Sequence, residues 1–179
     1  PLIVEQILTV LVGMADVVMV AEVGEAAMSG VALVDSISIL IIQLLAALAT
    51  GGAVICSQYI GKQQLERACH GAGQLILVTT VSSVLFASVA LLGGKHLLFL
   101  VFGQVEDAVM ENAVLYFRIT AFSYVFLALY NSGAALFRAM GNSKVSMVAS
   151  LIMNGINVIG NAICIYGLKM GVEGVAVPT

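Results

Sequence analysis

The sequence predicts an all-α fold, a polytopic membrane helix bundle with about five transmembrane helices. The chain of 179 residues is 61% hydrophobic and only 9% charged, whereas a soluble domain carries about 25% charged residues. Five mostly apolar stretches are each long enough for the roughly 20 residues that a spanning helix needs. They lie at about 1–21, 37–60, 70–93, 114–137 and 145–167.

Short polar segments separate these spans. EVGEAAMSG follows the first span, and the second span begins between Gly30 and residue 37. GKQQLER separates the second and third spans, and RAMGNSK separates the fourth and fifth. The loop near 94–112 is the longest, and we expect its HLLFLVF stretch to form a short interfacial piece. Residues 168–179 are expected to approach a sixth span.

The two ends of the sequence indicate a fragment. It begins with Pro rather than Met, and it ends in GVEGVAVPT, which resembles the start of a further segment. The motifs of an enzyme are not found: we see no nucleophile elbow, phosphate loop or paired carboxylates suited to hydrolysis. No basic patch indicates nucleic acid, and the three cysteines have no metal-ligand spacing. We therefore expect no enzyme activity and no cofactor.

Lys and Arg residues in the loops predict the orientation. Four of them lie on one side of the membrane and two on the other: Lys62, Arg67, Arg138 and Lys144 against Lys95 and Lys169. Cytoplasmic loops carry an excess of Lys and Arg, so a multi-pass protein of the cell membrane with a cytoplasmic amino terminus is predicted. Arg118 falls inside the fourth span near its outer end. Its side chain either pairs with an acid or, as we prefer, snorkels to the interface.

Asp16 is the strongest functional signal, because no other side chain in the apolar run 7–21 is charged. A carboxylate at a helix centre in lipid costs roughly 2.5–3.5 kcal/mol, so it is expected to meet a cation, a proton or a polar partner. Asn154, Asn157 and Asn161 are spaced i, i+3, i+7 and line one face of the fifth span. The first and fifth spans run in the same direction, which places Asp16 and Asn161 level to within a turn. This acid and these amides predict a cation or proton site in a transporter, with no metal beyond Na⁺ at Asp16.

Other polar residues inside the spans are candidates for lining a cavity. They are Gln43, Gln74, Tyr124, Asn131 and Asn154. Gln43 lies about six residues into the second span, at a depth similar to that of Asp16. For Asn154, Asn157 and Asn161 the alternative to a site role is hydrogen bonding between helices, worth about 0.6 kcal/mol per bond on average.

Four segments in order resemble the multidrug and toxic compound extrusion (MATE) family of efflux transporters. They are VGMADVVMVAEVGEAAMSGVALVDS, GGAVICSQYIGK, AALFRAMGNSK and NGINVIGNAICIYG followed by GVEGVAVPT. The likeness covers the whole chain. It implies a twelve-helix transporter of two six-helix lobes that face each other across a central cavity, and this chain resembles most of the amino-terminal lobe. The missing carboxy-terminal lobe and the lipid bilayer are the implied partners.

The resemblance also implies a function. The family exports cationic or amphipathic organic compounds, such as drugs and toxins, in exchange for Na⁺ or H⁺, and its first-helix acid matches Asp16. Its fifth-helix N-x-x-x-D pattern matches Asn157 and Asn161, where an amide replaces the family's acid. Asp16 is then the lone titratable group among these motif residues. The sequence leaves open the substrate and the choice between Na⁺ and H⁺.

The sequence has two alternative interpretations besides drug export. A flippase for lipid-linked precursors belongs to the same wider superfamily, but it should carry several basic residues inside its spans, and only Arg118 qualifies here. A membrane scaffold without transport activity gives no explanation for an acid and amides at one level. The sequence therefore favours a secondary-active antiporter with a cationic cargo.

Overall fold

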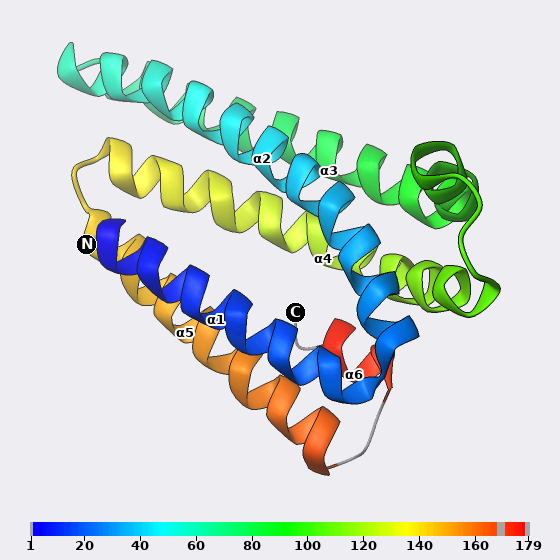
Figure 1. Ribbon diagram of the computed structural model, residues 1–179. Helices are drawn as coiled ribbons and strands as arrows, with labels where there is room; N and C mark the ends of the chain where they lie inside the picture. Colours follow the sequence, from blue (N-terminus) through cyan, green and yellow to red (C-terminus); the bar gives the residue numbers. More distant parts are fainter. Residues whose placement is uncertain (1, 168–170, 178–179) are drawn as a thin grey trace.

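The computed structural model describes residues 2–167 and 171–177, without the side chains of residues 2, 4, 5, 16, 22, 23, 172 and 175. Within these ranges every regular element is a helix, which confirms the all-α prediction (Figure 1). The long helices are α1 (Leu2–Val23), α2 (Glu25–Gly61), α3 (Leu65–Phe102), α4 (Asp107–Ala139) and α5 (Ser143–Ala162). A π-helical turn, η1 (Ile163–Gly167), continues α5, and the short helix α6 (Val172–Ala176) follows.

Four segments of the described chain are long and apolar enough to cross a membrane. They are Glu25–Gly61, Leu65–Phe102, Asp107–Ala139 and Ser143–Gly167. The four predicted spans between residues 37 and 167 each lie inside one of them. α1 contributes a shorter apolar stretch, Gln6–Ala21. The protein is therefore a polytopic membrane protein.

The predictions for two segments between the spans are wrong: both segments are helical, because the helices extend beyond the apolar spans. Residues 25–30 open α2, since Gly24 alone separates it from α1 with a φ of 138° that glycine adopts without strain. HLLFLVF is no separate interfacial piece: it continues α3 to Phe102, and only residues 103–106 separate α3 from α4. A continuous helix keeps its backbone hydrogen bonds satisfied near lipid, which a loop does not. Of the predicted approach to a sixth span, 168–170 and 178–179 lie outside the described residues.

The helices form two groups. α2, α3 and α4 pack against one another, and α1 pairs with α5 (Figure 1). The pair meets the three-helix group where α4 contacts α5 and where α1 contacts α2, and the short helix α6 contacts both α1 and α4. Figure 1 places the start of α1, the α2–α3 turn and the α4–α5 turn toward one end of the molecule. α1 and α5 therefore run side by side in the same direction.

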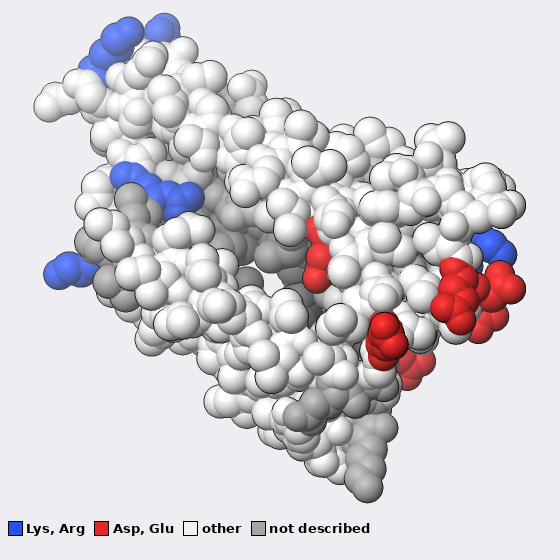
Figure 2. Space-filling view, in the orientation of Figure 1, with Lys and Arg blue, Asp and Glu red and all other residues white. Residues whose placement is uncertain are grey.

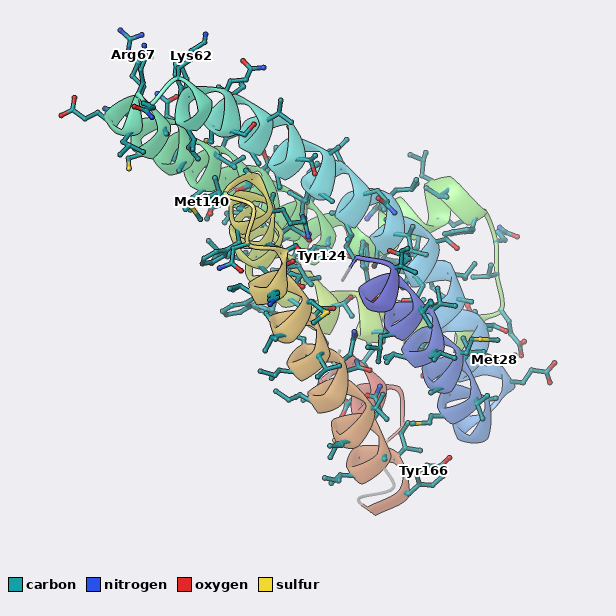
Figure 3. All side chains as sticks on the ribbon, turned by 90° about the vertical axis from the view of Figure 1, so that its left-hand side faces the viewer. Met28, Lys62, Arg67, Tyr124, Met140 and Tyr166 are labelled. Carbon is teal, nitrogen blue, oxygen red and sulfur yellow. The ribbon has the colours of Figure 1, made fainter. Side chains whose placement is uncertain are left out.

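Charged side chains separate between the two ends of the helices. On the face shown in Figure 2, Lys and Arg gather at the end with the α2–α3 and α4–α5 turns, and most Asp and Glu lie toward the other end. Figure 3 shows Lys62 and Arg67 at the tip of the α2–α3 hairpin. We call these the basic end and the acidic end. That the basic end is cytoplasmic stays a prediction.

Small residues and buried hydroxyl groups hold the three-helix group together, as is common between helices in membranes. Ser38 of α2 and Tyr124 of α4 share a hydrogen bond of 2.8 Å, and Thr79 of α3 and Ser132 of α4 share one of 2.7 Å. Gly30 of α2 is buried against the backbone of α4. α4 is thus tied to both of its neighbours.

We expect Gly30→Ala to destabilise the bundle by about 1–3 kcal/mol, the usual cost of overpacking. A Cβ at this position would lie 3.0 Å from the backbone nitrogen of Ala113 and from the backbone oxygen of Val109, so α4 itself would have to move. Gly51→Ala on the same helix is the matched control, because no atom lies within 4 Å of a Cβ there. The midpoint of thermal unfolding measures both variants. Equal midpoints for the two would show that α2 and α4 do not approach this closely.

Candidate functional site

The predicted acid and amides lie on the paired helices α1 and α5. Asp16 is fourteen residues beyond Leu2, where α1 begins, and Asn157 is fourteen residues beyond Ser143, where α5 begins. Both helices start toward the basic end, so the two backbone positions are about level, roughly 21 Å along each helix (Figure 1). The side chain of Asp16 lies outside the described residues.

The amides of α5 form a ladder along one side of the helix. Asn161 is fully buried and donates from Nδ2 to Oδ1 of Asn157 at 3.4 Å. Asn154 is partly buried and donates from Nδ2 to Oγ of Ser150, also at 3.4 Å. The π-helical turn begins at Ile163, two residues after the ladder ends, and such turns are frequent at functional sites.

The candidate cavity-lining residues outside α5 divide into two kinds. Tyr124 is only 1% exposed and its hydroxyl bonds to Ser38, so it packs α2 against α4 and offers no cavity surface in this structure. Figure 3 shows it inside the bundle, far from the basic tip. Asn131 is partly buried on α4, while Gln43 and Gln74 are exposed on α2 and α3. That Tyr124 lines a cavity stays a prediction; here its hydroxyl takes a nearby polar partner, as is usual for a tyrosine among apolar helices.

Asp35 is a second acid within the helices, and sequence reasoning missed it because it lies between Gly30 and residue 37, where the start of the second span was left open. It lies ten residues beyond Glu25, where α2 begins, and it is partly buried. The hydroxyl of Tyr116 on α4 donates to its Oδ1 at 3.2 Å. The signal was present in the sequence, since the apolar residues around Asp35 continue directly into the second span. Asp35 is therefore a second carboxylate within the apolar helices, outside the motif residues that were compared.

A polar stripe on α2 was also missed. Every seventh residue is polar along four heptads, and residues seven apart lie on nearly the same helix face. These residues are Ser29, Ser36, Gln43, Thr50 and Ser57, all of them exposed or partly exposed. The buried residues of α2, among them Val34, Leu45 and Cys56, lie on the opposite side of the helix.

The hydroxyls of this stripe bond to their own helix rather than to neighbouring helices. Ser36, Thr50 and Ser57 donate to backbone carbonyls three or four residues earlier, at 2.9, 2.8 and 2.7 Å. At the end nearer the α2–α3 turn, Thr50 and Ser57 line a cavity of about 190 Å³ together with Arg138 of α4. The stripe thus gives one side of a hydrophobic helix a polar surface that is exposed or partly exposed along its length.

The surface is hollowed between the α1–α5 pair and the three-helix group (Figure 2). One embedded acid lies on each side of the α1–α2 turn, Asp16 seven residues before the end of α1 and Asp35 ten residues into α2. A carboxylate can accept a proton, coordinate Na⁺ or pair with an organic cation, and an amide oxygen can help to coordinate Na⁺ or accept a hydrogen bond. Such a layer of acids and amides, set inside apolar helices, is typical of transport proteins.

Two curated proteins are similar to almost the whole chain. The uncharacterized transporter YisQ of Bacillus subtilis is 30% identical over 100% of this chain and 40% of its own length. The probable multidrug resistance protein NorM of Thermotoga maritima is 24% identical over 98% of this chain and 38% of its own. The chain spans about two fifths of the length of these relatives.

Solved transporter structures have the same arrangement of helices. A multidrug resistance MATE family transporter in an outward-facing conformation matches with a TM-score of 0.89 and 25% identity, over 98% of this chain and 38% of that chain. An inward-facing structure of such a transporter matches with a TM-score of 0.87 and 27% identity, over 94% and 38%.

The fold is that of a multi-pass membrane protein, and the proteins that it resembles are transporters. Residues 1–163 match the MatE family, and this match covers most of the chain. The protein belongs to the MatE family of transporters, as the four quoted segments predicted.

Proposed function

We propose that this chain is the amino-terminal part of a secondary-active antiporter that exports cationic or amphipathic organic compounds in exchange for H⁺ or Na⁺. The observation that carries the proposal is the acid of α1 at the level of the amide ladder on α5, in a chain of the MatE family. A single carboxylate can hold either the coupling ion or a cationic cargo. Because the two compete for one charge, binding of one weakens binding of the other.

A cationic cargo is also supported by Asp35. A second acid in the same layer strengthens the negative potential of the site and favours cations over anions. A flippase for lipid-linked precursors would need a positive potential at this site, because its cargo is anionic. The cation embedded in α4, Arg118, lines a different cavity with Lys95 of α3. The charges around the α1–α5 pair thus support the antiporter over the flippase.

The polar stripe of α2 supports a missing partner lobe. Polar side chains that face lipid are costly, so an exposed stripe with Gln43 at its middle favours contact with water or with another protein surface. In the proposal this face borders the central cavity, opposite the carboxy-terminal lobe. The chain matches outward-facing and inward-facing transporters about equally well. This similarity favours transport by rocking of two nearly rigid lobes.

The proposed location is the cell membrane, with the amino terminus in the cytoplasm. Lys62, Arg67, Arg138 and Lys144 lie in or beside the two turns at the basic end, and cytoplasmic loops carry an excess of such residues. The acid and amide layer then lies in the outer half of the membrane. Cargo would leave to the outside from there.

The test is export of a fluorescent organic cation from vesicles that contain the intact transporter, under a Na⁺ gradient and a H⁺ gradient in separate experiments. We expect one gradient, directed inward, to drive export and to be dissipated by it. Collapse of that gradient by an ionophore is the control. Transport that neither gradient accelerates would contradict antiport, and movement of an anionic lipid-linked precursor in its place would favour the flippase.

A further inference from the structure

A second cavity, separate from the proposed transport site, lies between α3 and α4 toward the acidic end. Its volume is about 240 Å³, and the described residues that line it belong to these two helices: Lys95, Met110, Glu111, Val114, Leu115 and Arg118. It thus contains two cations and one acid beside an apolar wall. Nothing in the proposed antiport mechanism uses these residues, so the inference does not depend on that mechanism.

The three charges lie at different depths below the α3–α4 turn. Glu111 is four residues beyond the start of α4, Lys95 seven residues before the end of α3, and Arg118 eleven residues beyond the start of α4. At 1.5 Å per residue these positions are about 6, 10 and 16 Å from the turn. The acid is therefore nearest to water and the arginine is deepest.

Helix lengths place this cavity at the boundary of the bilayer. α3 has 38 residues and α4 has 33, which correspond to about 57 and 50 Å, whereas the hydrocarbon core is about 30 Å thick. When the helices are centred, about 10–14 Å of each projects into the headgroup layer. Glu111 and Lys95 then lie in that layer, and the guanidinium of Arg118 reaches it from just below by snorkelling.

Exposed apolar side chains surround the charged residues. On α3, Leu92 and Phe99 lie three residues before and four residues after Lys95, and they are 90% and 54% exposed. On α4, Phe122 lies four residues after Arg118 and is 65% exposed. Residues three or four apart share a helix face. The cavity therefore opens onto a face that suits acyl chains better than water.

We propose that this cavity binds the headgroup of an aminophospholipid, a phosphatidylethanolamine of the surrounding bilayer. The phosphate would lie between Lys95 and Arg118, since guanidinium and ammonium groups pair strongly with phosphate oxygens. The terminal ammonium lies nearer to water than the phosphate does, and it would meet Glu111. An acyl chain would follow Val114 and Leu115. From the water inward, the protein has an acid and then two cations, and the headgroup has its ammonium and then its phosphate. Each charge of the headgroup therefore meets an opposite charge of the protein.

The alternative lipids match the cavity less well. A phosphatidylglycerol offers its phosphate to the two cations but brings no cation to Glu111. A phosphatidylcholine has a quaternary ammonium, which cannot donate a hydrogen bond to the carboxylate. Glu111 is therefore the residue that selects the lipid, and Lys95 and Arg118 bind the phosphate that all three lipids share.

The test measures lipid retention by the intact transporter with native mass spectrometry, after equilibration with equal amounts of the three lipids carrying identical acyl chains. We expect the wild-type protein to retain phosphatidylethanolamine at least several-fold more than either other lipid. Glu111→Gln should remove this preference without lowering total retention, and Arg118→Gln should lower retention of all three. Glu106→Gln, an exposed acid at the same end but outside the cavity, should retain the wild-type pattern.

Several outcomes would overturn the proposal. Equal retention of the three lipids by the wild-type protein would do so without any variant, as would a preference for phosphatidylglycerol that Glu111→Gln leaves unchanged. Free phosphate that protects the wild-type protein from heat as well as the lipid does would point to an anion site instead. If Glu111→Gln fails to fold, Glu111→Asp keeps the charge and must keep the preference.

Discussion

Asp16→Asn is expected to abolish ion-driven export while the transporter still reaches the membrane in near-normal amounts. The substitution keeps the size of the side chain and removes the charge that is proposed to hold the coupling ion and the cargo in turn. Loss of a charged partner in a desolvated site costs about 2–5 kcal/mol, so binding of either cation should weaken at least about thirtyfold. Initial rates of export, normalised to the amount of protein in the membrane, measure the effect.

The matched control for this substitution is Asp107→Asn. Asp107 is an exposed acid at the first residue of α4, outside the proposed site. Asp107→Asn removes the same charge by the same substitution as Asp16→Asn, and its export rates should equal those of the wild-type protein. Wild-type rates in Asp16→Asn would remove Asp16 from the mechanism. Loss of the Asp16→Asn protein from the membrane would instead assign the carboxylate to helix packing.

Asp35→Asn is expected to weaken the apparent affinity for the coupling ion by up to about twentyfold. Two unit charges about 10 Å apart interact by about 1.7 kcal/mol at an effective dielectric constant of 20, so a second carboxylate in the same layer helps to hold a cation. The substitution removes this contribution and keeps an acceptor for the hydroxyl of Tyr116, which donates to Asp35 at 3.2 Å. The ion concentration that gives half-maximal export measures the shift.

Tyr116→Phe separates the charge of Asp35 from its role in packing α2 against α4. It removes the hydrogen bond, worth about 1 kcal/mol, and leaves the carboxylate in place. We expect this variant to be less stable to heat but to need nearly the same ion concentration as the wild-type protein. If both variants lower the melting temperature and neither changes the ion dependence, Asp35 is a structural residue.

The helical class and the approximate spans could be predicted because apolar length is a strong signal in a chain with so few charges. The ends of the helices could not be predicted from apolar length. Gly24 reverses the chain within one residue, so EVGEAAMSG, which looks like a loop, is mostly helix. Asp35 was missed for a related reason: it lies between Gly30 and residue 37, where the start of the second span was left open, so it was not considered an embedded acid.

The spacing of polar residues predicted the amide face of α5, whereas the regular spacing of polar residues on α2 was overlooked. The spacing of Asn154, Asn157 and Asn161 predicted a common face, and the structure joins Asn157 to Asn161 by a hydrogen bond. The heptads through Gln43 were equally visible in the sequence. The partner of Tyr124, by contrast, was out of reach, because the register between α2 and α4 depends on contacts such as that of Gly30 with the α4 backbone. A single sequence does not report that register.

The most direct test of the central claim is ion release on cargo binding. The purified intact transporter is loaded with the coupling ion in detergent, an organic cation is added, and the released Na⁺ or H⁺ is counted per protein. Competition for one carboxylate predicts release of about one ion by the wild-type protein and none by Asp16→Asn. Equal release by both proteins, or cargo binding without release by the wild-type protein, would contradict an exchange of cations at Asp16.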